Sequence, residues 1–121
     1  MWLIFFLILF SPFTLAELNK KPILQDILVP KNLSENITAR LFCSIKKGKN
    51  LKFDWYLNND KLETNDERRI VSHEESSELV IKSLSINDIG EIKCICKNQY
   101  GEDVQKAFLL FNGNKSQIFN F

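Results

Sequence analysis

Apolar side chains recur at every second position in five stretches of the chain. These stretches are residues 41–45, 51–57, 79–81, 92–96 and 107–111. A period of two places successive side chains on opposite faces, so each stretch predicts a β-strand with one buried face. Gly, Asn, Asp and Lys cluster between the stretches, at residues 46–50, 58–60, 87–90 and 98–101, in combinations typical of turns.

One further segment precedes these strands. Pro22 and Pro30 bracket it, and we expect an edge strand there because proline cannot donate an N–H to a ladder. No stretch beyond residue 16 sustains a helical period. Short strands at close, regular spacing predict an all-β fold, either a sandwich or a barrel.

The chain begins with an apolar leader. Residues 1–10 are unbroken apolar sequence, and Thr14 and Ala16 place small residues where a signal peptidase reads. We interpret residues 1–16 as a signal peptide, residues 17–111 as one domain and residues 112–121 as a short polar tail. An uncleaved membrane anchor would need about 20 apolar residues. We therefore expect a secreted, extracellular protein whose mature chain has no membrane span.

Charge and glycosylation signals narrow the class of partner. The chain has 16 basic and 15 acidic residues, whereas a nucleic-acid-binding domain would show a strong basic excess. We therefore expect no nucleic-acid partner. Acceptor sequences for N-glycosylation begin at Asn32, Asn36 and Asn114, and they carry meaning in a chain that enters the secretory path.

Several fixed spacings resemble those of a known family. Trp55 follows Cys43 by twelve residues, and residues 79–94 read Leu-x-Ile-x-x-Leu-x-x-x-Asp-x-Gly-x-Ile-x-Cys. Residues 94–101 continue as Cys-x-Cys-x-Asn-x-x-Gly. Over residues 22–111 this pattern resembles immunoglobulin domains of the intermediate set (I-set). The segments "LKFDWYLNNDKLE" and "RRIVSHEESSELVIKSLSINDIGEIKCICKNQYG" are also similar to domains of the Down syndrome cell adhesion molecule (Dscam) family.

The resemblance implies an immunoglobulin-like, two-sheet Greek-key sandwich. It also implies a disulfide between Cys43 and Cys94, packed against Trp55 as the core tryptophan. Cys96 then remains a free thiol, and its parity with Cys94 predicts that it is buried as a small apolar side chain. Two alternatives are an intermolecular disulfide through an exposed Cys96 and a metal site, for which His73 is the only histidine. Cys96 is also a competitor of Cys94 for pairing during folding.

The resemblance also concerns the turn before the second cysteine. The family usually has a tyrosine two residues before that cysteine, whereas this chain has Ile92, so a hydrogen bond typically contributing about 1 kcal/mol is lost. Asp88 stands where the family often has a salt bridge to an arginine of strand D. Arg68 and Arg69 are both available, and we expect Arg69 to be the partner.

No group of residues indicates catalysis. His73 lies in a polar segment without a serine or cysteine motif, and no carboxylates form a recognisable pair. We therefore expect no enzymatic activity and no cofactor or metal.

Binding is better supported, by apolar residues that face outward. If Phe53, Trp55, Cys94, Ala107 and Leu109 point inward, four apolar side chains from strands C, F and G point outward: Tyr56, Ile95, Phe108 and Leu110. An apolar patch of this kind commonly marks a protein interface. The alternatives are that the first strand, the tail or a glycan covers it, or that the last strand is shifted by one residue.

A second candidate surface is charged. The turn "KKGKN" is basic and the segment "HEESSE" is acidic, and in this fold the two lie at the same end of the sandwich. They neutralise one another or form a self-complementary end that selects partners. A heparin site made of Lys46, Lys47, Lys49 and Lys52 is disfavoured because the cluster is short and has acidic neighbours.

These observations together predict a secreted, glycosylated immunoglobulin-domain protein that acts by protein–protein binding. The resemblance favours adhesion with homophilic recognition, through a weak homodimer or another extracellular immunoglobulin-type protein. The alternatives are a soluble ligand-binding or defence-related decoy with a heterologous partner, and a fragment or short form of a multi-domain membrane receptor.

Overall fold

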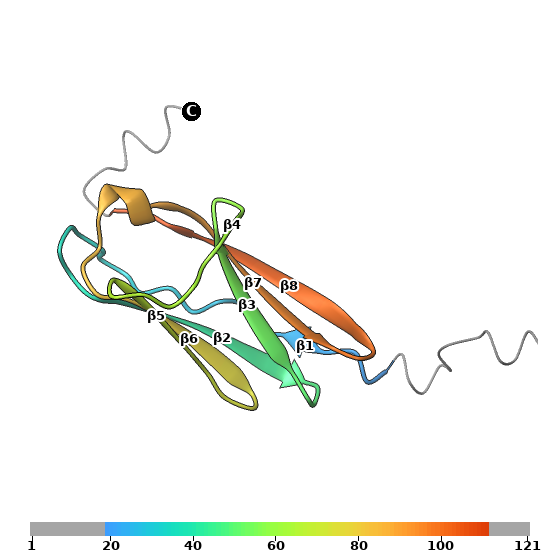
Figure 1. Ribbon diagram of the computed structural model, residues 1–121. Helices are drawn as coiled ribbons and strands as arrows, with labels where there is room; N and C mark the ends of the chain where they lie inside the picture. The colour runs from blue at the N-terminus through green and yellow to red at the C-terminus, as the bar shows by residue number, and fades with distance from the viewer. Residues whose placement is uncertain (1–18, 112–121) are drawn as a thin grey trace, which may run out of the picture.

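The computed structural model describes residues 19–111. Its strands are β1 (Ile23–Leu24), β2 (Ala39–Lys47), β3 (Lys52–Leu57), β4 (Asp60–Lys61), β5 (Arg68–Ser72), β6 (Ser76–Ile81), β7 (Gly90–Asn98) and β8 (Gly101–Leu109), with a short 3-10 helix η1 (Ile86–Asp88) before β7. They form two sheets in the orders β1-β2-β6-β5 and β4-β3-β7-β8, and all pairs are antiparallel. Figure 1 shows the two sheets facing each other, so the predicted two-sheet sandwich is confirmed.

The inward faces of both sheets form one core around Trp55. Trp55 is fully buried, and its indole Nε1 donates a hydrogen bond of 2.9 Å to the Ser77 hydroxyl, which in turn pairs with the Ser72 hydroxyl. The indole N–H, the one polar group of this side chain, is therefore satisfied without water. Alternation predicted the inward set correctly, since Phe53, Cys94 and Leu109 are also buried.

A disulfide joins the two sheets through this core. It links Cys43 on β2 to Cys94 on β7, and both residues are fully buried. The two cysteines are separated by 51 positions, and closing a loop of that length stabilises the fold by about 4 kcal/mol in the chain-entropy account. The bridge therefore offsets part of the cost of ordering a small domain.

The salt bridge at the turn before β7 uses a different arginine from the one expected. Arg68, not Arg69, contacts Asp88: its Nε and Nη2 donate to Oδ1 at 3.0 and 2.6 Å. The other oxygen of Asp88 accepts the backbone N–H and the hydroxyl of Ser85. Strand parity explains the correction, because Arg68 lies on the face of β5 that is partly buried, while Arg69 is exposed beside Val80 on the outer face.

The Asp-x-Gly spacing has a local cause. Gly90 has a φ of +142°, and an added Cβ would overlap the side-chain amide of Asn58. That amide accepts the N–H of Glu91 at 2.9 Å and donates to the carbonyl of Ile89 at 3.2 Å. Glycine is therefore required where the β3–β4 turn closes against the start of β7.

Two strand boundaries differ from the expectation. The last strand, β8, starts at Gly101 rather than near residue 107, because the turn at 99–100 pairs its polar first half directly with β7. The segment between Pro22 and Pro30 contributes only two strand residues and one isolated bridge, Leu28 to Phe42.

Candidate protein interface

The outer face of the β3–β7–β8 sheet presents mixed rows of side chains. Cross-strand pairing places Asp54, Ile95 and Val104 in one row, and Tyr56, Lys93 and Lys106 in the next. Phe108 follows in a third row, opposite Glu91. We call this surface the recognition face and define it by its apolar and basic members: Tyr56, Lys93, Ile95, Val104, Lys106 and Phe108.

The apolar residues of the recognition face differ in exposure. Phe108 is 64% exposed and Val104 36%, whereas Tyr56 and Ile95 are half-buried. The Lys93 ammonium lies 4.8 Å from the centre of the Tyr56 ring, which partly covers the ring by a cation–π contact. Phe108 is therefore the most accessible aromatic side chain of this face, and Leu109 beside it is fully buried, which fixes the register of the strand.

The predicted patch is not continuous. Lys93 and Lys106 stand opposite each other between the Ile95 row and Phe108. Leu110 lies beyond the end of β8 and is half-buried, so it does not extend the strand's outward face. The sequence pattern did not predict Val104 as part of this face, because it lies among charged residues. Its cross-strand pairing with Ile95 places it there.

Like charges face each other twice on this sheet. Besides the Lys93–Lys106 pair, Lys52 lies opposite Lys97. Directly opposed like charges destabilise a ladder, so the surface is basic at a cost to the isolated domain. Of the acidic residues on the face, Asp54 is already paired with Lys61 at 3.6 Å.

The opposite sheet also exposes apolar side chains. Leu28 is 65% exposed and lies beside Phe42, which is 38% exposed. Val80 faces the same side but is buried, in register with the long side chains of Arg40 and Arg69. This surface is the natural control for the recognition face, since it offers similar exposure in a different charge setting.

The basic and acidic turns do lie at one end of the sandwich. Lys49 from one turn and Glu74 and Glu75 from the other line a shared hollow of about 590 Å³. None of the three forms a salt bridge within the described residues. His73, also at this hollow, is exposed and its backbone N–H donates to the carbonyl of Ser76.

Cys96 is fully buried without a disulfide partner in residues 19–111. Burial, together with the smaller effect of the negative charge of Asp103, its cross-strand neighbour, raises the pKa of the Cys96 thiol to about 11. A protonated, inaccessible thiol is a poor nucleophile and a poor metal ligand. In this region no group of three or more His, Cys, Asp or Glu side chains is placed to hold a metal ion.

The predicted glycosylation positions fall at the far end of the domain. Asn32 and Asn36 are exposed, in left-handed backbone conformations with φ of 60° and 67°. They precede β2, whereas the basic turn follows it about 30 Å away. Asn114 and the predicted signal peptide, residues 1–16, lie outside the described residues. Within 19–111, no helix has the length and apolarity needed to cross a membrane.

Known proteins share this sequence pattern and fold. The pattern of the immunoglobulin I-set domain matches residues 22–111. Zwei Ig domain protein zig-4 of Caenorhabditis elegans is 37% identical over 71 residues, which are 57% of this chain and 27% of that protein. Muscle M-line assembly protein unc-89 of the same organism is 30% identical over 91 residues, 75% of this chain but 1% of that protein. The chain thus spans a small part of either relative.

Solved structures agree on the fold. The Dscam1 Ig7 domain, isoform 5, superposes with a TM-score of 0.70 and 21% identity, covering 76% of this chain and 97% of that one. The M1 domain from titin gives a TM-score of 0.69 and 24% identity, covering 76% and 95%. At these identities the likeness establishes the architecture alone.

Proposed function

Because the chain belongs to the immunoglobulin I-set family, we propose that it is an extracellular recognition module that binds another protein through the recognition face. The observation that carries this proposal is Phe108, an aromatic side chain 64% exposed on a regular strand, with the Ile95–Val104 pair on the same face. Exposed aromatic anchors dominate the affinity of many protein interfaces. A catalytic role has no support, since the domain type typically works by binding.

The charges of the face indicate the chemistry of the partner. Lys93 and Lys106 divide the apolar rows, so a good partner offers carboxylates between apolar side chains. A second copy of the chain, paired symmetrically about the Lys93–Lys106 row, would bring lysines toward lysines. The charge pattern therefore favours a heterologous, acidic partner over the homophilic adhesion that the Dscam resemblance implies, and self-association through this face is the second candidate.

Secretion is part of the proposal. The apolar leader at residues 1–16 supports it, and so does the Cys43–Cys94 disulfide, because such bonds persist in oxidising compartments. Glycans at Asn32 and Asn36 would lie near the start of β2 and leave the basic end uncovered. Mass spectrometry of the protein recovered from culture medium tests this directly, by its N-terminal residue and its glycan masses.

Sedimentation velocity of the secreted chain over a wide concentration range tests the mode of recognition. The variants are Phe108→Lys and, as a matched control, Leu28→Lys, which changes an equally exposed apolar residue on the opposite sheet. A dimer that disappears only in Phe108→Lys supports self-association through the recognition face. If the dimer is lost only in Leu28→Lys, the interface lies on the opposite sheet, which contradicts our assignment.

A chain that stays monomeric is tested against a panel of extracellular proteins that includes the chain itself. We expect a partner whose binding weakens at least tenfold in Phe108→Lys and less than twofold in Leu28→Lys. Equal losses in the two variants would refute the assignment of the face. Before these assays, the unfolding midpoints of both variants are measured and must equal that of the parent.

A further inference from the structure

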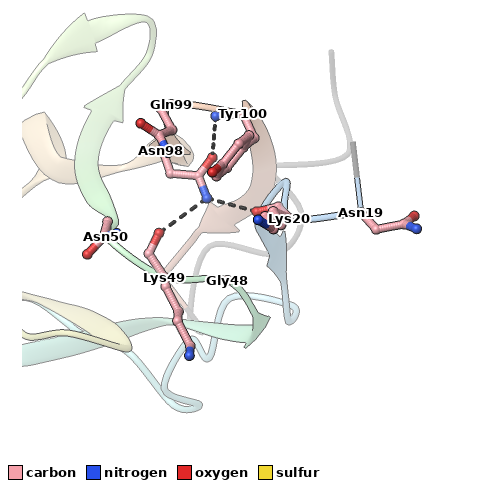
Figure 2. A pocket seen from close by; sticks show the side chains of 8 residues that line it. All are labelled: Asn19, Lys20, Gly48, Lys49, Asn50, Asn98, Gln99 and Tyr100. Carbon is pink, nitrogen blue, oxygen red and sulfur yellow. Dashed lines mark hydrogen bonds between the residues drawn. The ribbon is translucent and has the colours of Figure 1, made fainter. Parts of the chain in front are cut away.

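Five lysines from three segments lie at one end of the sandwich. We call this group the lysine end and define it as Lys20, Lys21, Lys49, Lys52 and Lys97, all of them exposed. The Asn98 side chain holds the segments together: its Nδ2 donates to the carbonyl of Lys20 at 2.9 Å and to that of Lys49 at 3.2 Å (Figure 2). Only the fold brings Lys20, Lys21 and Lys97 to the basic turn.

The lysine end carries uncompensated charge. None of its five ammonium groups forms a salt bridge within residues 19–111. Lys52 and Lys97 face each other across β3 and β7, an arrangement that costs stability unless an anion lies between or above them. Two carboxylates lie nearby, and neither forms a salt bridge with these lysines within residues 19–111: Glu102 lies opposite Lys97, and Asp103 accepts the N–H of Leu24.

Two of these lysines, Lys20 and Lys49, line a hollow of about 440 Å³. Figure 2 shows it lined by amide side chains, by the Tyr100 ring and by the chain around Gly48. Lys20 lies over the Tyr100 ring, its Nζ 5.4 Å from the ring centre. The side-chain amides of Asn19, Asn50 and Gln99 bring hydrogen-bond donors and acceptors to the lining of the hollow.

From this arrangement we infer that the lysine end is a binding site for a sulfated polysaccharide. Flexible ammonium groups bind sulfates as point charges, and the amides of the hollow suit sugar hydroxyls. The acidic segment that disfavoured such a site in the sequence lies across a second hollow and pairs with none of these lysines. Lys52 and Lys97 form the row next to Asp54 and Ile95 on the same face of the sheet. The two sites are still tested by different changes, Phe108→Lys for the recognition face and lysine substitutions for this end, so the failure of this inference would leave the proposed function standing.

Heparin affinity chromatography and titration with a defined heparin oligosaccharide test the inference on the full secreted chain. The test variant is Lys49→Gln with Lys97→Gln. The matched control is Lys31→Gln with Lys82→Gln, which removes the same charge from exposed positions at the far end. At about 0.1 M salt we expect the test variant to bind roughly 10- to 50-fold more weakly and the control to change less than threefold.

Binding to a linear polyanion also predicts salt dependence. The slope of log affinity against log salt should become shallower by about one unit or more in the test variant, because fewer counterions are released. Equal losses in both variants, or no heparin binding by the parent at about 0.1 M salt, would overturn the inference. Tighter binding to a poly-glutamate peptide than to heparin would also overturn it, in favour of an acidic protein ligand. Matching unfolding midpoints exclude misfolding as the cause.

Discussion

Replacing Arg68 by methionine tests the salt bridge that fastens β5 to the turn before β7. Methionine keeps most of the length of the side chain and removes its charge and donors. The Asp88 side chain is only 7% exposed and would lose both hydrogen bonds to Oδ1, keeping only those from Ser85 to Oδ2. Removing one partner of a buried pair typically costs about 3–5 kcal/mol. The Arg68 side chain is 21% exposed, so water replaces part of the loss, and we expect about 2–4 kcal/mol.

Urea unfolding measures this cost, with the fluorescence of Trp55 as the signal. Trp55 is the single tryptophan of residues 17–121, and it lies in the core. The matched control is Arg69→Met, because the Arg69 side chain is exposed and forms no salt bridge within the described residues, and we expect it to change stability by less than about 0.5 kcal/mol. Equal losses in the two variants would refute our reading of the strand parity.

A double-mutant cycle with Asp88→Asn separates the pair from its surroundings. If the two side chains interact as the geometry indicates, the second substitution costs little once Arg68 is gone, and the coupling energy is about 2 kcal/mol. Additive losses would mean that each residue acts through other neighbours.

Three further predictions concern the core, a turn and the glycans. The pKa of Cys96 is higher in the folded than in the unfolded chain, so unfolding free energy should fall as the pH rises from about 9 to 11, by roughly 2–3 kcal/mol. Urea titrations should show no such component in Cys96→Ala, and a pH profile shared by variant and parent would contradict the assignment. Gly90→Ala should lower the free energy of unfolding by at least about 2 kcal/mol, and by more than Gly101→Ala does, in thermal unfolding. Both glycines have positive φ, but the new Cβ at position 90 would overlap a hydrogen-bonded amide, whereas at position 101 it would meet only a flexible lysine side chain. Asn32→Gln and Asn36→Gln should each remove one glycan mass and lower the unfolding midpoint slightly, because asparagine adopts the left-handed backbone of these positions more readily than glutamine; an unchanged mass would disprove occupancy.

Much of the fold was predictable because burial enforces a period of two. The inward residues around Trp55 follow the pattern without exception on β3 and β7, where one face packs against the other sheet. The period of two did not predict β5, which begins with two arginines and is short, nor the polar first half of β8. These residues are strands because of their hydrogen-bonded neighbours, and their own side chains carry little hydrophobic signal.

The functional surfaces were less predictable for a related reason. The exposure of Phe108 followed from parity, but its separation from Ile95 by two lysines depends on which residues stand opposite across strands. The choice of Arg68 over Arg69 likewise depends on the face of a strand that the sequence did not reveal. The lysine end joins three segments that are distant in sequence. The charges of the basic turn alone therefore underestimated the number of lysines at that end.

The placement of the disulfide has a mechanical consequence. Residues 19–22 enter the sandwich at the end formed by Lys49 and Asn98, while residues 110–111 leave it at the opposite end, beside the start of β7 (Figure 1). Tension applied between these two points passes from β2 to β7 through the covalent bridge. The loop between Cys43 and Cys94, 51 positions apart, is then shielded from the pull. At about 3.6 Å per residue, roughly 180 Å of chain stays hidden until the bridge is reduced, so under load the oxidised domain behaves as a short tether and the reduced domain as a long one.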